Sequence, residues 1–170
     1  MGLVDRALSV ASRATARVVV CLDGGGASER DRLIRERANV RPSEGRASLN
    51  PVKKLDKEIA DLEQRLRDSL LTVEVQALPA PAWSRIKREC PPDSKDALQR
   101  ASGFNVDAAA QKALIAASWA VDGDEREPLS QTDWQKLHEA LSGGDWERIV
   151  IAILGLNQTS QSEAIARGKA

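Results

Sequence analysis

The fold is decided by residues 129–156, LSQTDWQKLHEALSGGDWERIVIAILGL. Apolar residues recur three or four positions apart in both halves, and a Ser-Gly-Gly-Asp turn at 142–145 separates the halves. Ser130 and Asp133 stand three residues apart, as in an N-terminal capping box. The stretch therefore predicts a helical hairpin over residues 130–156.

The second helix of this hairpin has too many apolar residues for one buried face. One side carries Trp146, Ile149, Val150, Ile153 and Leu156, and the other carries Ile151, Ala152 and Leu154. Leaving a large apolar side chain in water forfeits about 1.5–3 kcal/mol. Such a helix is either buried centrally or covered by a partner. The residues predicted to contact a partner are Trp134, Trp146, Val150, Ile151 and Leu154.

Heptad-like spacing marks an earlier helix, which begins at Pro51 after the capping residue Asn50. Its apolar positions alternate three and four residues apart and include Leu55, Ile59, Leu62 and Leu66. This seam predicts either self-association of two copies or packing of an ordinary amphipathic helix on its own domain. Both interpretations stay open at this point.

The remaining patterns predict few strands. The β-branched run at 18–22 and the alternating apolar and polar residues at 71–77 each predict a short strand. An alanine-rich helix is expected to run through Val121 and to end in an acidic loop at 122–125. The fold class expected is thus mainly α, a small helical domain with one or two short β-strands.

Composition shifts along the chain predict its division into parts. Residues 1–38 read as an N-terminal extension of helix, strand and helix, and residues 51–157 as the helical domain. Between them, residues 39–50 are rich in Pro, Ser, Gly and Arg, which predicts an exposed or flexible linker. Residues 158–170 are polar and alanine-rich and predict a disordered tail.

Overall charge and cysteine usage exclude several classes of protein. Lys plus Arg and Asp plus Glu number 25 each, so no basic excess favours nucleic acid or an anionic membrane. The longest apolar run, at 149–156, is too short to span a bilayer. Cys21 and Cys90 lie far apart and lack metal-ligand spacing, as expected of reduced thiols in a cytosolic protein.

Motifs for catalysis, cofactors or metals are not found in the sequence. The single histidine, His138, has no second histidine or cysteine nearby, and the acidic residues at 122–127 lack the spacing of a calcium loop. The glycines at 24–26 are not followed by the Gly-Lys-Ser/Thr of a phosphate loop. We therefore expect a protein that is not an enzyme and uses no cofactor.

DNA binding is disfavoured as well. A helix-turn-helix built on the 130–156 hairpin would use its second helix for recognition, and Arg148 is the only basic residue of that helix. The tryptophans lie in apolar stripes and are not interleaved with basic residues.

The order of motifs from about Val52 to Gln158 resembles the tail assembly chaperones of siphophages that infect actinobacteria. The resemblance is carried by Leu71-Thr72-Val73-Glu74-Val75-Gln76-Ala77-Leu78-Pro79, Trp83, Pro91-Pro92, Gly103-Phe104-Asn105-Val106-Asp107, Ala113-Leu114-Ile115-Ala116-Ala117-Ser118, Leu129-Ser130, Leu141-Ser142-Gly143-Gly144-Asp145-Trp146 and Ala152-Ile153-Leu154-Gly155-Leu156-Asn157. The region from Val52 to Gln158 makes up roughly two thirds of the chain, and the order of these motifs is more specific than any one of them.

Membership of that family implies a non-catalytic role in the cytoplasm of the host cell. Such proteins are similar to the shorter product of the frameshifted chaperone pair of lambdoid phages. They bind the tape measure protein, keep it soluble and promote assembly of the tail tube, so the tail tube protein is a second expected partner. Two alternatives stay open: a structural virion component, such as a head–tail connector or tail-associated protein, and a helical DNA-binding regulator.

Overall fold

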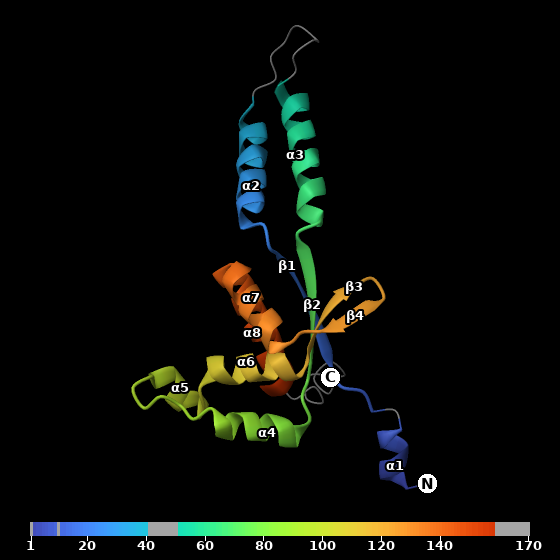
Figure 1. Ribbon diagram of the computed structural model, residues 1–170, viewed down its shortest axis with the longest axis vertical. Coiled ribbons are helices and arrows are strands. Elements are labelled where there is room, and N and C mark those ends of the chain that lie inside the picture. The colour runs from blue at the N-terminus through green and yellow to red at the C-terminus, as the bar shows by residue number, and fades with distance from the viewer. Residues whose placement is uncertain (1, 10, 41–50, 159–170) are drawn as a thin grey trace, which may run out of the picture.

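The computed structural model describes residues 2–9, 11–40 and 51–158, and Figure 1 shows their arrangement. The elements in chain order are α1 (Leu3–Leu8), β1 (Thr15–Cys21), α2 (Gly24–Asn39), α3 (Pro51–Arg67), β2 (Leu70–Gln76), α4 (Ala80–Glu89), α5 (Ala97–Ser102), α6 (Val106–Ala116), β3 (Ser118–Asp122), β4 (Glu125–Pro128), α7 (Gln131–Ala140) and α8 (Gly143–Gln158). The predicted linker and the predicted tail fall mainly on residues 41–50 and 159–170, which lie outside the described residues.

Helices dominate the chain as predicted, but they pack on a four-stranded antiparallel sheet of order β1-β2-β3-β4. The prediction of one or two short strands was therefore wrong. The alanine-rich helix ends at Ala116 and does not reach Val121, because residues 118–122 form β3 against β2. The acidic loop is the turn of the β3–β4 hairpin, where Gly123 has a φ of 56°, a conformation that favours glycine.

The sheet unites the two parts into which the sequence divides the chain. β1 belongs to the stretch predicted as an N-terminal extension, and it pairs with β2 along its whole length, from Thr15 opposite Gln76 to Cys21 opposite Leu70. Residues 1–38 and 51–157 thus contribute neighbouring strands to one sheet.

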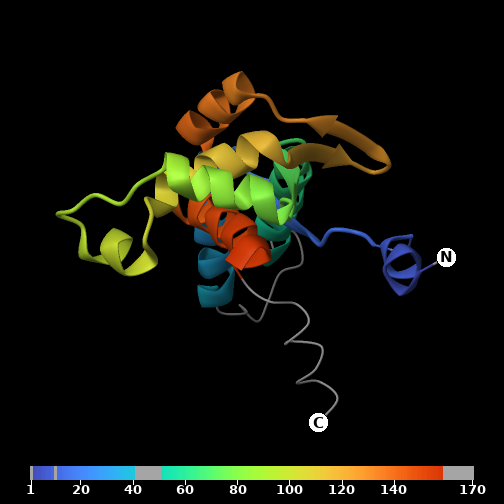
Figure 2. The same ribbon diagram turned by 90° about the horizontal axis from the view of Figure 1, so that it is seen from below.

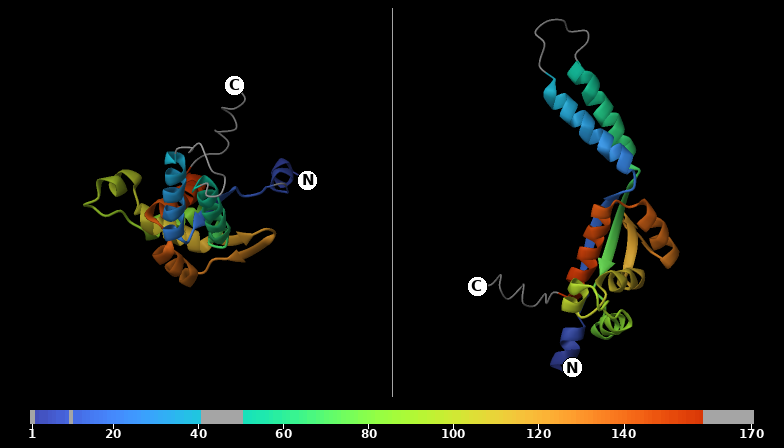
Figure 3. Two further views of the ribbon diagram at one scale, coloured as in Figure 1. Left: turned by 90° about the horizontal axis from the view of Figure 1, so that it is seen from above. Right: turned by 90° about the vertical axis from the view of Figure 1, so that its left-hand side faces the viewer.

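One face of the sheet holds the main core. Alternate residues of β1 and β2 point to this face, α8 packs against both strands (Figure 3), and α6 packs against α8. The largest side chains that are fully buried there are Val20, Val73, Val75, Leu114, Ile149 and Ile153. The opposite face is more open, since Val19 and Leu70 are 46% and 49% exposed.

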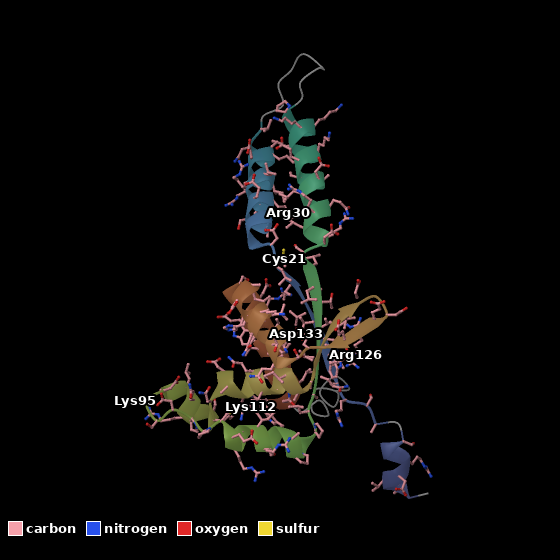
Figure 4. All side chains as sticks on the ribbon, viewed as in Figure 1. Cys21, Arg30, Lys95, Lys112, Arg126 and Asp133 are labelled. Atoms are coloured by element: carbon pink, nitrogen blue, oxygen red, sulfur yellow. The ribbon has the colours of Figure 1, made fainter. Side chains whose placement is uncertain are left out.

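Helices α2 and α3 form a second, separate hairpin that extends beyond one end of the sheet (Figure 1). Its small core consists of Leu33 from α2 and Leu55, Leu62 and Leu66 from α3, with Ile59 packed against it. Arg30 lies between the two helices and forms an ion pair with Glu63 at 2.7 Å (Figure 4).

The predicted self-association seam is thereby covered within the chain. Leu55, Leu62 and Leu66 are 5–8% exposed, and Ile59 is half-buried. The sequence left open whether this seam pairs two copies or packs within one chain. In the structure, α3 packs on α2 of the same chain. Pairing of two copies through the same leucines requires α2 and α3 to separate first.

The start of α7 follows the sequence prediction. Ser130 is the N-cap, its Oγ accepts a hydrogen bond from the backbone N–H of Asp133, and its own backbone N–H donates to the Asp133 carboxylate. The hydrogen bonds from the Ser130 hydroxyl and backbone hold the pKa of the Asp133 carboxyl below its ordinary value. The stabilisation from this box is therefore present above the ordinary pKa of Asp133 and is lost as the pH falls through the lowered value.

Replacing the cap tests its contribution. We expect Ser130→Ala to lower the free energy of unfolding by about 1 kcal/mol, because a backbone N–H at the helix start loses its acceptor. Urea denaturation measures the change. Thr132→Ala is the control, since Thr132 is exposed in the same first turn and should change stability by less than about 0.5 kcal/mol. An equal loss in both variants would contradict a specific capping role.

Candidate partner-binding groove

A groove of about 270 Å³ lies between α6 and α7, which run side by side in Figure 2. Its lining combines apolar and polar side chains: Gln111, Leu114 and Ile115 from α6, Gln131, Trp134, Gln135, His138 and Glu139 from α7, and Trp146 from α8. This volume is slightly below that of sites for drug-sized ligands, which begin at about 300 Å³. The groove is suited to one or two large side chains of a partner.

The floor of the groove is held in place by hydrogen bonds. Trp134 is buried, and its indole Nε1 donates to the Ser118 hydroxyl at 2.9 Å. That hydroxyl in turn donates to the carbonyl oxygen of Leu114, which is itself fully buried. A buried indole N–H without an acceptor would be costly, so Ser118 fixes the position of the Trp134 ring.

Aromatic contacts form one end of the groove. The rings of Trp134 and Trp146 meet edge to face, with centroids 6.1 Å apart. The imidazole of His138 is perpendicular to the ring of Trp146, with the two centroids 4.6 Å apart. Because Trp146 is only half-buried, part of its apolar surface stays accessible to a partner.

The rim of the groove is polar, with one aliphatic exception. Gln111, Gln131 and Gln135 contribute uncharged amides, and Glu139 contributes a carboxylate. Ile115 stands among these residues and is 40% exposed. An apolar floor with amides at its edge suits a helix that inserts a large side chain and places polar groups at the rim.

The structure brings two of the five predicted partner-binding residues to this groove, Trp134 and Trp146. Val150 and Leu154 are half-buried and pack against the main core, and neither lines the groove. Ile151 is 69% exposed on α8, and it does not line the groove either. The predicted residues therefore do not all line the groove.

Sequence reasoning missed the contribution of α6. One side of α6 carries Ala109, Ala110 and Ala113, which are fully buried. The groove uses the other side, where Gln111 and Ile115 stand four residues apart. The available signal in the sequence was Ile115, a large apolar residue within the alanine-rich helix.

Arg148, the one basic residue on which DNA recognition by α8 would depend, is already engaged. Its Nη1 donates to the Val19 carbonyl oxygen and to the Asp145 carboxylate, both at 3.1 Å. Across the described ranges, no group of three His, Cys, Asp or Glu residues is placed to hold a metal ion. Cys21 and Cys90 are free thiols. None of the helices that the structure describes is long and apolar enough to cross a membrane.

No protein-family model, curated protein or solved structure matches this chain.

Proposed function

We propose that this protein is a non-catalytic tail assembly chaperone, which binds a phage tape measure protein in the host cell cytoplasm, keeps it soluble and promotes assembly of the tail tube around it. The observation that supports this function best is the groove between α6 and α7, with its apolar floor of Leu114, Trp134 and Trp146. The resemblance of the motif order to tail assembly chaperones supplies the identity of the client.

The chemistry of the groove matches such a client. A tape measure protein is long, helical and rich in apolar side chains, which aggregate when they are left in water. Covering one large side chain in the groove contributes about 1.5–3 kcal/mol, which is too little for tight binding by one copy. Many copies bound along one client would cover it with useful avidity and still release it when the tail tube replaces them.

A charge placed at the rim tests the groove. We expect Ile115→Glu to abolish the gain in solubility that the wild-type protein confers on a co-expressed tape measure protein, because the carboxylate must be desolvated when the client helix enters. Leu98→Glu is the matched control, since Leu98 is an 80% exposed aliphatic residue on α5, away from the groove. The soluble fraction of the client is measured by quantitative blotting.

Two outcomes would contradict this proposal. Equal loss of client solubility with Leu98→Glu would show that the groove is not the binding site. Recovery of the protein in purified phage particles, measured by mass spectrometry, would favour the alternative of a structural virion component such as a head–tail connector. A chaperone is absent from finished particles.

A further inference from the structure

The two edges of the sheet differ in how they are protected from pairing with another strand. β4 is short, and its sequence Glu-Arg-Glu-Pro has three charges and a proline, which are common devices against edge-to-edge pairing. β1 is seven residues long and reads Thr-Ala-Arg-Val-Val-Val-Cys, with one charge and no proline. Long, β-branched edges of this kind favour addition of a further strand.

The pairing pattern shows which backbone groups of β1 are free. Just outside the strand, the carbonyl oxygen of Ala14 accepts from Ala77, and the N–H of Leu22 donates to Ser69, both at 2.9 Å. Because these groups alternate in an antiparallel ladder, the even-numbered residues of β1 bond to β2. The odd-numbered residues, Thr15, Arg17, Val19 and Cys21, turn their backbone groups to the free edge.

Among the described residues, one of these edge groups has a hydrogen-bond partner. The Val19 carbonyl oxygen accepts from Arg148 of α8 at 3.1 Å. The other N–H and C=O groups of Thr15, Arg17, Val19 and Cys21 have no protein partner in that part of the chain. β1 is seven residues long and rich in β-branched side chains, and most of its edge backbone groups are available. Such an edge can form a ladder of backbone hydrogen bonds with a further strand.

We propose that the free edge of β1 is a self-association site, at which β1 pairs antiparallel with β1 of a second copy of this chain to form one continuous eight-stranded sheet. The register that fits best is centred on Val19. It places Val19 opposite Val19 of the second copy and Arg17 opposite Cys21, so no like charges face each other. A register centred on Arg17 would set two guanidinium groups directly opposite and is disfavoured.

The α2–α3 hairpin does not obstruct this arrangement. The α2–α3 hairpin continues the direction of β1 and β2 beyond one end of the sheet (Figures 1 and 3). Antiparallel pairing sends the two hairpins in opposite directions, so they do not meet. A face-to-face dimer through the open side of the sheet fits less well, because it would bring together Arg17 and Arg126 from both copies.

Arg148 limits access to the edge. Pairing centred on Val19 uses the carbonyl oxygen that Arg148 now occupies, so the guanidinium must withdraw first. Its ion pair with Asp145 at 3.1 Å remains available after withdrawal. We therefore expect Arg148→Ala to lower the dimer dissociation constant, whereas a charge introduced on β1 should raise it.

Sedimentation velocity of the full chain, measured over a range of concentrations, tests the proposal. Val19→Lys should raise the dimer dissociation constant at least about tenfold, since it sets two ammonium groups opposite each other on the symmetry axis. Val19 is 46% exposed, so lysine is accommodated without unfolding. Leu70→Lys is the matched control, because Leu70 is 49% exposed on the same face but lies on β2, whose two edges are paired.

The outcomes separate the edge from other modes of association. Weakening by Val19→Lys alone, with amide protection of Arg17 and Val19 that increases with concentration in hydrogen exchange, supports the proposal. Equal weakening by both lysine variants would assign the contact to the open sheet face and overturn it. A wild-type protein that stays monomeric up to about 1 mM would overturn it as well. None of these measurements depends on the identity of the client.

Discussion

Removal of the two charges that flank Glu74, in an Arg17→Met/Arg126→Met double variant, should lower the free energy of unfolding by about 3–5 kcal/mol. Glu74 lies on the central strand β2 with a side chain only 9% exposed. One carboxylate oxygen accepts from Arg17 Nε at 2.8 Å, and the other forms an ion pair with Arg126 Nη2 at 2.9 Å. Methionine keeps much of the covering apolar stem and removes the charge, so the carboxylate stays buried without a partner.

Methionine is also a suitable replacement for Arg126 because of the contact of Arg126 with Trp119. Its guanidinium lies 3.7 Å from the ring centroid of Trp119, and Figure 4 shows this arginine on the β3–β4 hairpin. A thioether also packs favourably against an aromatic ring, so the apolar contact with Trp119 is largely retained. The loss measured by urea denaturation then reports mainly on the unpaired carboxylate.

A third substitution is the control for this prediction. Adding Glu74→Leu to the double variant should restore most of the lost stability, because replacing a whole buried ion network by apolar residues is often neutral. Failure of Glu74→Leu to restore it would show that the loss came from packing at Arg17 and Arg126. A double variant within about 0.5 kcal/mol of wild type would show that water reaches the carboxylate.

Local signals explain which parts of the fold the sequence predicts. The capping box at Ser130 is encoded within a few residues, and α7 begins where it is expected. The predicted break at residues 142–145 is shorter than expected, because α8 already begins at Gly143. β3 depends on a distant partner. Its residues continue an alanine-rich helical pattern, and pairing of Ala120 with Val73 of β2 decides in favour of a strand.

The groove was predictable only where its residues follow from local sequence patterns. Trp134 and Trp146 were both predicted as partner contacts from the apolar pattern of the 130–156 hairpin. The acceptor for the Trp134 indole, Ser118, belongs to β3, so it is brought to the groove only by tertiary structure. Ile115 reaches the rim because α7 packs beside α6, an arrangement that periodicity within one helix does not specify.

Two isoleucines on α8 should respond very differently to truncation. Ile153→Ala should lower the free energy of unfolding by about 2–5 kcal/mol, since its side chain is fully buried and its removal leaves a cavity. Ile151→Ala should change stability by less than about 0.5 kcal/mol, because Ile151 is 69% exposed. Both substitutions gain the same helix propensity, so their difference isolates burial.

This pair of variants also decides how the surplus apolar surface of α8 is used. The sequence left two interpretations, central burial or cover by a partner, and the structure has central burial for Ile149 and Ile153 but not for Ile151. Urea denaturation at two protein concentrations separates the remaining cases. If Ile151→Ala destabilises the protein strongly, and more so at high concentration, a second copy covers Ile151. If the loss is small at both concentrations, the side chain of Ile151 stays in water in the isolated protein.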